Sequence, residues 1–438
     1  MKNASGIVMI KRALIALAFS PIFCLAADDA ESTVVVMTSY PDSMVSRFEA
    51  AFEQELPHYQ VQVIWRQSAD ALDWLRQPGQ GGVDVYWAPS PRNFVVLARE
   101  NGWQPLGAVA APVPSHVGQT QLRDDHDMYV AAELAGYGFV VNHQVLEREG
   151  LPTPKEWTDL ADPDWADLLV VPGPRVGFAP VMIDIVLQAY GWEPGWDLWR
   201  RISANARFAD RGASFISDEI VSGRAGAGVT IDFFAASAIA GGAELELLYP
   251  SRSGLNPAHI AITRDTGNIE AARAFVSFVL SRSGQQLLAH PDIRKLPVLP
   301  SAYEGLPPNY HNPFAAAAQG NYRYDSVAGQ PRLALISALF EETIVAHHNQ
   351  LREVQLRLEA LRSRNVDVSV ADNLLSNLLP VDEIQAARLA WLFDRSAEPN
   401  AQRELEQQRL SERWRAHAGA VWHSIEQWLL EQEDQGVR

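Results

Sequence analysis

Short β-branched runs alternate with segments of helical periodicity along most of this chain. Residues 32–37 form an apolar run typical of a strand, and residues 43–56 follow with apolar side chains at helical spacing. Further strands are expected at residues 60–65 and 83–87, with a short helix at 69–76 between them. This alternation predicts a parallel sheet with ligand space at the carboxyl ends of its strands.

The same alternation returns in a second stretch of the chain. Residues 128–141 contain two apolar runs around a Gly-Tyr-Gly sequence, and we interpret them as a crossing from one lobe to another. A return crossing is expected between strands at residues 245–249 and 259–263. The remaining elements expected here are strands at 168–171 and 226–230 and helices at 180–190, 195–204, 214–222, 269–280 and 284–289.

The character of the chain changes after about residue 325. Residues 332–362, 371–379, 381–393 and 401–432 are expected to be helical, and none of these segments contains a strand pattern. In the last segment, apolar residues between Trp414 and Leu429 recur every three or four positions and form one stripe. We interpret the stripe as core packing, with the helical segment placed against the first lobe.

The amino terminus has the pattern of a secretory signal. Lys2, Lys11 and Arg12 precede an apolar stretch that ends in Cys24-Leu25-Ala26, a small-x-small cleavage sequence. The apolar stretch is short for a membrane span, although an uncleaved anchor is the alternative. We therefore expect a periplasmic protein whose signal, residues 1–26, is removed.

Cysteine content and charge exclude several functions. Cys24 is the only cysteine, so the chain after residue 26 has no disulfide, no thiolate metal site and no cysteine nucleophile. Removing the three cations of the signal from a net charge of −17 leaves −20. That balance argues against nucleic acid and against anionic membrane surfaces as partners, whereas a local field can still favour an anion in a cleft. No cofactor motif is present, and we expect none to be bound.

Candidate ligand contacts in the first half follow the predicted strands. Free N–H groups and hydroxyls at helix amino termini are suited to anions. Ser39 and Tyr40 lie between the first strand and its helix, although they can instead serve the helix cap. Arg66 and Ser68 follow the second strand, and Ser90 follows the third with the same ambiguity.

Three further candidates belong to the second half. Arg175 lies between a strand and a helix, where its guanidinium can grip a phosphate with two hydrogen bonds, and a surface ion pair is the alternative. Ser214 precedes a helix in a capping pattern. Asp232 follows a strand and can accept hydrogen bonds from sugar or glycerate hydroxyls, or else cap the helix after it.

Three stretches resemble the extracellular solute-binding proteins of ABC-type transport systems, within their iron-type group. They are residues 151–163, with a Pro-x-x-Trp-x-Asp-Leu sequence, residues 214–231, and residues 268–275 with 280–285. The resemblance covers roughly residues 30–310, and Arg175 and residues 251–258 are also placed on it. It implies a type II binding-protein fold with two α/β lobes and a hinge, followed here by an all-helical extension. Its lobe boundaries would be 27–133 with 252–324 for lobe one, 134–251 for lobe two, and 325–438 for the extension.

The resemblance also implies a function. The chain would be a binding protein, not an enzyme, that captures a small anionic solute such as a phosphoglycerate. A long helical segment after the binding module is similar to transport regulatory proteins of this family, which control a membrane sensor kinase. The expected partner is therefore a membrane permease or a sensor kinase, without membrane insertion of the chain itself after signal cleavage.

Three other functions stay open at this point. Ferric sites in this family use adjacent tyrosines in lobe two, whereas the comparable place here holds Phe233 and Phe234, which have no ligand atom. No metal-binding histidine pattern is present, so we expect no metal. An envelope hydrolase stays possible without a Gly-x-Ser-x-Gly sequence because catalytic residues can be dispersed. A helical scaffold that has lost its ligand is the third alternative.

Overall fold

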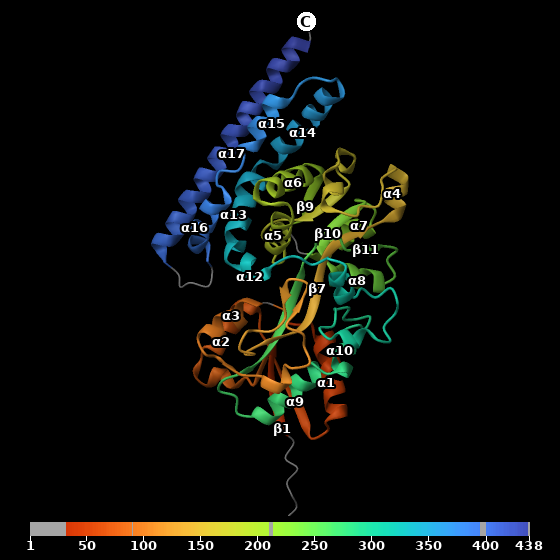
Figure 1. The fold of residues 1–438 in the computed structure, drawn as a ribbon, viewed down its shortest axis with the longest axis vertical. Coiled ribbons are helices and arrows are strands. Elements are labelled where there is room, and N and C mark those ends of the chain that lie inside the picture. Colours follow the sequence, from red (N-terminus) through yellow and green to blue (C-terminus); the bar gives the residue numbers. More distant parts are fainter. Residues whose placement is uncertain (1–31, 90, 210–212, 395–399, 437–438) are drawn as a thin grey trace, which may run out of the picture.

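The computed structural model describes residues 32–89, 91–209, 213–394 and 400–436, so the predicted signal lies outside it. Two α/β lobes are joined by long strands, and a helical extension follows (Figure 1). We call the part around residues 32–88 and 269–279 lobe one, and the part around residues 169–231 lobe two. The strands are β1 (Ser32–Thr38), β2 (Tyr59–Trp65), β3 (Val85–Ala88), β4 (Trp103–Gln104), β5 (His116–Val117), β6 (Thr120–Gln121), β7 (Val130–Val141), β8 (Leu169–Pro172), β9 (Ala206–Ala209), β10 (Ala227–Ile231), β11 (Glu246–Leu248) and β12 (Leu255–Thr263).

The main sheet runs through both lobes in the order β2-β1-β3-β12-β7-β10-β8-β9. Its outer pairs are parallel, as the alternation of strands and helices predicts. The central strands β12 and β7 are antiparallel to their neighbours. Every residue of β7 is buried, which explains why the sequence of this crossing is apolar apart from Glu133.

Helices cover the sheet in both lobes. Lobe one carries α1 (Asp42–Glu55), α2 (Ser68–Leu75), α3 (Pro91–Arg99), α9 (Ile269–Val279), α10 (Arg282–Leu287) and α11 (Pro313–Ala318). Lobe two carries α4 (His143–Glu149), α5 (Ala179–Tyr190), α6 (Trp192–Asn205), α7 (Ala213–Val221) and α8 (Asp232–Ala240). Short 3-10 helices lie at Pro78–Gly82, Gly107–Val109, Trp157–Ala161, Pro163–Trp165, Pro300–Tyr303, Gln330–Arg332, Val345–His347 and Ala390–Phe393.

The extension consists of α12 (Ser326–Gly329), α13 (Leu333–Thr343), α14 (His348–Ser363), α15 (Ser369–Ser376), α16 (Glu383–Leu389) and α17 (Ala401–Gly436). It packs on lobe two, because α13 contacts α5 and α14 contacts α6. Figure 1 shows α17 along the outer side of these helices, with lobe one at the opposite end of the molecule. The expected packing against lobe one is therefore wrong. Among the described helices, none has an apolar stretch long enough to span a bilayer.

Two main hydrophobic cores follow from this arrangement. The core of lobe one includes residues from Val34 to Tyr322. The core of lobe two includes residues from Ala135 to Ile231 together with residues from Tyr324 to Leu429. The extension is thus part of the lobe-two core. The chain also crosses between the cores a third time, at residues 322–324, because Tyr322 belongs to the core of lobe one and Tyr324 to the core of lobe two.

Candidate functional site

The strand directions of both lobes converge on the middle of β7. Strand β10 is antiparallel to β7, so its carboxyl end at Ile231 pairs with Tyr137. Strand β3 ends at Ala88, which pairs with His259 of β12, and His259 in turn pairs with Ala131 of β7. Residues that follow β1, β3 and β10 therefore approach β7 residues 131–137 from opposite sides. Ligands bind at this kind of edge in open α/β sheets.

Tyr40 brings lobe one to this point. It follows β1, and its hydroxyl donates a 2.8 Å hydrogen bond to Oε1 of Glu133 in β7. The ring packs on Trp87, with centroids 4.9 Å apart, and the indole N–H of Trp65 donates to the Tyr40 carbonyl. Burial, and then the charge of Glu133, raise the pKa of Tyr40, so its hydroxyl stays a donor.

Lys295 supplies a buried positive charge. The next residue, Leu296, exchanges two backbone hydrogen bonds with Leu134 of β7, which places Lys295 beside Glu133. Its Nζ lies 3.0 Å from Glu133 Oε1, and the two side chains are 8% and 1% exposed. The same Nζ lies 3.8 Å from the ring centroid of Phe233, a cation–π contact with lobe two.

Asp232 approaches from lobe two as the first residue of α8. Its Oδ2 accepts hydrogen bonds from the Gly136 N–H at 2.6 Å and from the Tyr249 hydroxyl at 3.0 Å. Glycine is required at 136 because a Cβ there would lie 2.6 Å from the Tyr249 ring. Burial raises the pKa of Asp232 to about 7, although the Gly136 N–H and Lys295 act in the opposite direction.

Two acceptor atoms of this cluster have no partner. Asp232 Oδ1 and Glu133 Oε2 are buried, and no described residue forms a hydrogen bond with them. An unpaired buried carboxylate oxygen costs free energy, so such atoms mark a place where donors from a ligand would be stabilising. We call Tyr40, Glu133, Asp232 and Lys295 the interlobe cluster. It combines one ammonium group, two free acceptor oxygens and aromatic walls.

The other candidates of lobe one lie at the same sheet edge as Tyr40. Thr38 pairs with Trp65, so Ser39 and Arg66 leave adjacent strands at the same level. The Arg66 guanidinium lies over the Trp74 ring, 4.4 Å from its centroid. Ser68 is the first residue of α2, and its carbonyl accepts a hydrogen bond from Asn93. These three residues border the edge, and among the described residues they form no hydrogen bond, ion pair or ring contact with the side chains of the interlobe cluster. Ser90 lies outside the described residues.

The lobe-two candidates have different outcomes. Arg175 is 82% exposed and forms a 2.9 Å ion pair with Glu341 of α13, so its described contact is the surface ion pair and not the interlobe cluster. The backbone of Ser214 belongs to α7, but its side chain lies outside the described residues. Asp232 is the lobe-two candidate that the structure brings to the convergence of the strands.

Sequence reasoning missed Glu133, Lys295 and Tyr249. Two signals were available for them. Glu133 is the one acidic residue in the buried β7, where a charge needs a partner. Lys295 is one of only two lysines after residue 26. Neither signal shows that Glu133 and Lys295 pair with each other, because Lys295 reaches β7 through pairing between segments about 160 residues apart.

Comparison with known proteins supports the fold. A model of the bacterial extracellular solute-binding protein family matches residues 100–316. The phosphoglycerate transport regulatory protein of Salmonella typhimurium is 25% identical over 368 residues, which cover 82% of this chain and 88% of that protein.

Solved structures agree. Iron-bound HitA of Pseudomonas aeruginosa has a TM-score of 0.54 at 15% identity, with 69% of this chain and 99% of that chain covered. AfuA of Actinobacillus pleuropneumoniae, with fructose 6-phosphate bound, has a TM-score of 0.51 at 18% identity, with 62% and 86% covered. The predicted type II binding-protein fold is therefore confirmed.

Proposed function

Because residues 100–316 belong to the family of bacterial extracellular solute-binding proteins, we propose that this chain captures a small anionic solute between its two lobes. The solute is an organic phosphate of the phosphoglycerate type. The observation that carries the proposal is the interlobe cluster, in which a buried ammonium group lies beside two unpaired carboxylate oxygens.

The chemistry of the cluster suits a hydroxylated anion. Lys295 can pair with a phosphate or carboxylate once a ligand competes with Glu133. Asp232 Oδ1 and Glu133 Oε2 can accept hydrogen bonds from hydroxyl groups of the same ligand. Ser39, Arg66 and Ser68 at the adjoining edge would contact the far end of the solute. The resemblance to a protein named for phosphoglycerate transport supports the same ligand class.

A ferric ion is the second candidate. Tyr40, Glu133 and Asp232 provide hard oxygen atoms of the kind that such an ion prefers. Phe233 and Phe234 provide no ligand atom, and the Lys295 ammonium already occupies one side of Glu133. These contacts favour an organic anion over a metal, and the experiment below includes both.

The cellular context belongs to the proposal as well. A cleaved signal at residues 1–26 would deliver the protein to the periplasm, where its partner would be a membrane permease or a sensor kinase. The match to the phosphoglycerate transport regulatory protein spans more residues than the 324 that precede the extension, so it reaches into the extension. Sharing of this part with a regulatory protein supports the sensor kinase as partner.

The test is calorimetric and thermal-shift titration of residues 27–438. The ligands are 3-phosphoglycerate, phosphoenolpyruvate, fructose 6-phosphate and ferric citrate. A ligand that binds only the folded state raises the free energy of unfolding, by about 2.7 kcal/mol at a hundredfold excess over Kd, and Tm rises with it. We expect saturable binding of one organic phosphate. Saturation with ferric citrate alone would support the metal candidate, and binding of none of them would contradict the proposal.

A paired variant locates the site. Removing Lys295 alone would leave Glu133 buried without its ion-pair partner, so the variant is Glu133→Gln with Lys295→Met. We expect at least a tenfold loss of affinity. Lys155→Met, which changes the exposed second lysine, is the matched control and should bind as the unmodified chain does. Unchanged affinity in the paired variant would mean that the solute binds elsewhere.

A further inference from the structure

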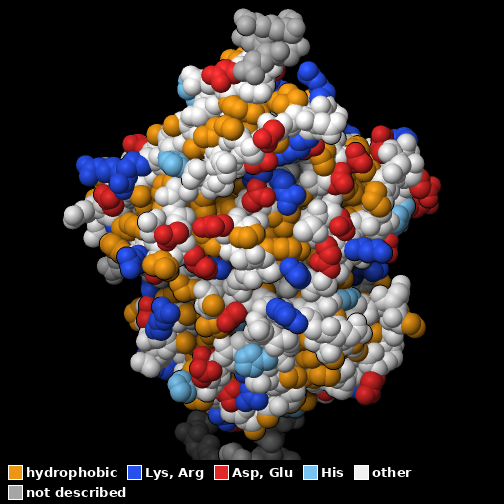
Figure 2. Space-filling view, turned by 45° about the horizontal axis from the view of Figure 1, so that its top comes forward, with side chains coloured by type: hydrophobic (Ala, Val, Ile, Leu, Met, Phe, Trp, Pro, Cys, Tyr) orange, Lys and Arg blue, Asp and Glu red, His pale blue; other side chains and the backbone are white. Residues whose placement is uncertain are grey.

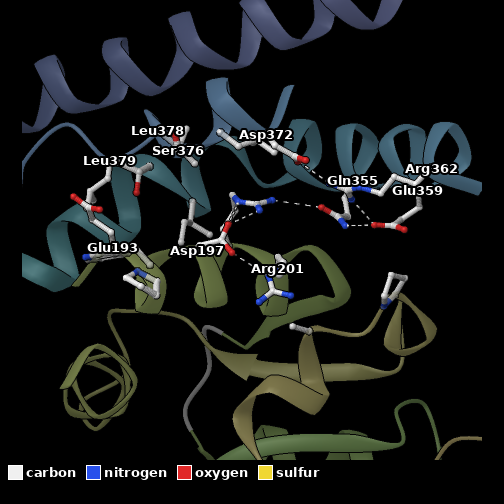
Figure 3. A pocket seen from close by; sticks show the side chains of 18 residues that line it. Glu193, Asp197, Arg201, Gln355, Glu359, Arg362, Asp372, Ser376, Leu378 and Leu379 are labelled. Carbon is white, nitrogen blue, oxygen red and sulfur yellow. Dashed lines mark hydrogen bonds and ion pairs between the residues drawn. The ribbon is translucent and has the colours of Figure 1, made fainter. Parts of the chain in front are cut away.

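A cavity lies where the extension meets lobe two. Its volume is about 600 Å³, within the range of small-molecule sites. One wall is α6, and the other is formed by α14, α15 and the residues after α15 (Figure 3). No residue of the interlobe cluster lines it. The cavity is therefore separate from the proposed solute site.

Part of the lining is apolar. Ile344, Leu375, Leu378 and Leu379 from the extension face Trp196 from α6. Trp196, Ile344, Leu375 and Leu378 are at most 6% exposed. These side chains form a surface on which an aliphatic or aromatic body could displace water favourably.

The polar lining is a chain of hydrogen bonds that spans the cavity. Asp197 of α6 accepts from both Arg200 and Arg201, and Arg200 reaches Gln355 of α14 at 3.4 Å. Gln355 bonds to Glu359, and Arg362 pairs with Glu359 and Asp372 (Figure 3). On the α6 wall two guanidinium groups share one carboxylate, whereas on the α14 wall two carboxylates share one guanidinium. Glu193 also lines the α6 wall, on the side of Leu379, so the unbalanced guanidinium charge of this wall is confined to the surroundings of Asp197 (Figure 3).

Trp196 provides an independent sign of a missing ligand group. Its indole N–H is buried, and no described residue accepts a hydrogen bond from it. Trp196 and Arg200 are four residues apart on α6, so they lie on one face of the helix. Arg200 is only 8% exposed, and its bond to Gln355 is long. A single acceptor group could satisfy the indole N–H and shorten the contacts of Arg200.

We propose that this cavity binds a small amphipathic carboxylate. The carboxylate accepts hydrogen bonds from Trp196 Nε1 and Arg200, and the apolar body rests on Leu375, Leu378 and Leu379. Because the two walls belong to lobe two and to the extension, the occupied cavity holds the extension more firmly on lobe two. The protein would then respond to a second small molecule independently of the solute at the interlobe cluster.

The experiment titrates residues 27–438 with octanoate, and with octanol as the comparison that lacks the carboxylate. We expect one saturable octanoate site and much weaker binding of octanol. Trp196→Phe should weaken octanoate at least about tenfold, because it removes a donor to a charged group. Trp391→Phe, at an indole that is 64% exposed, is the matched control and should change nothing.

Ser376→Trp tests the location of the octanoate site a second time, without the loss of a core side chain. Ser376 is exposed and lines the cavity, so the larger side chain should fill the cavity and abolish octanoate binding. Asp232→Asn alters only the interlobe cluster and should leave octanoate binding intact. Equal affinity for octanol and octanoate, binding unaffected by Trp196→Phe and Ser376→Trp, or no octanoate binding would each overturn the proposal. None of these outcomes bears on solute binding between the lobes.

Discussion

At the scale of single residues, Asp232 is a carboxyl group whose pKa the fold raises to about 7. It is 2% exposed and bridges α8 to Gly136 of the crossing strand. Its pKa of about 7 means that solvent pH near neutrality sets how much negative charge the interlobe cluster carries. Protonation would leave Lys295 and Glu133 as a neutral pair and would favour an incoming anion.

The pH dependence of stability tests this assignment. The folded pKa of Asp232 is raised from its ordinary value of 3.8, so the folded state keeps a proton that the unfolded chain releases. Stability from this group is therefore present at low pH and is lost as pH rises toward about 7. Relative to the unmodified protein, Asp232→Asn should gain up to about 4 kcal/mol between pH 4 and pH 7, at about 1.4 kcal/mol per pKa unit. Urea unfolding at several pH values measures it.

Asp218→Asn serves as the control for that measurement. Asp218 is exposed on α7, and its difference from the unmodified protein should not vary over the same pH range. A flat difference for Asp232→Asn as well would mean that Asp232 is ionised in the folded protein at pH 4–7.

The buried pair of Lys295 and Glu133 leads to a second prediction. Lys295→Met should cost about 3–5 kcal/mol of unfolding free energy, because it leaves a buried carboxylate without its cation. Adding Glu133→Gln should restore part of this loss, since the amide carries no charge and can still accept from Tyr40. Chemical denaturation of both variants measures which of them has the lower free energy of unfolding. A double variant less stable than the single one would show that the pair is not the source of the cost.

At the scale of elements, local pattern was sufficient for most helices and strands but not for their partners. The strand at Ser32–Thr38 and the helix at Asp42–Glu55 lie within one residue of their predicted positions. The four-residue strand β9 was missed because it follows α6 directly, without a turn. An apolar stripe shows that one face of a helix is buried, but not against what, so the extension was assigned to the wrong lobe.

The limits of local sequence patterns also explain which residues of the interlobe cluster were predicted. Tyr40 and Asp232 were predicted because each follows a strand directly, and strand ends are a local signal. Glu133 and Lys295 depend on pairing between β7 and a segment far along the chain, which local periodicity does not encode.

The last helix offers a prediction at this scale. Trp422 is fully buried in α17, so Trp422→Ala should cost about 3–5 kcal/mol. Trp391→Ala, in the same extension but exposed, should stay within about 0.5 kcal/mol. Because α17 shares a core with lobe two, hydrogen exchange should show the loss of protection in α5 and α6 as well. Loss confined to α17 would mean that the extension unfolds separately.

At the scale of the whole molecule, two rigid parts are expected: lobe one, and lobe two with the extension. Positive and negative side chains are interspersed on the face seen in Figure 2, so no field of one sign is seen there to hold the parts together or apart. Their connection is instead the three crossings at β7, β12 and residues 322–324.

Spin-label distances test this division. The chain after residue 26 has no cysteine, so introduced ones are labelled specifically. Addition of the solute should shorten the distance between labels at Gln77 and Glu147, which lie in lobe one and lobe two. The distance between Glu147 and Gln427 of α17 should stay constant, because these positions share a rigid part. A change in the second distance alone would contradict the shared body.

The shared core also has a consequence for how the chain folds as it is synthesised. Lobe one has all of its core residues by Tyr322, whereas lobe two needs residues as late as Leu429. A chain that emerges amino end first would hold the apolar faces of α5 and α6 uncovered until its final helix arrives. Premature termination before Leu429 would thus damage a lobe that begins some 300 residues earlier, and the addition of the last helix is the step that completes folding.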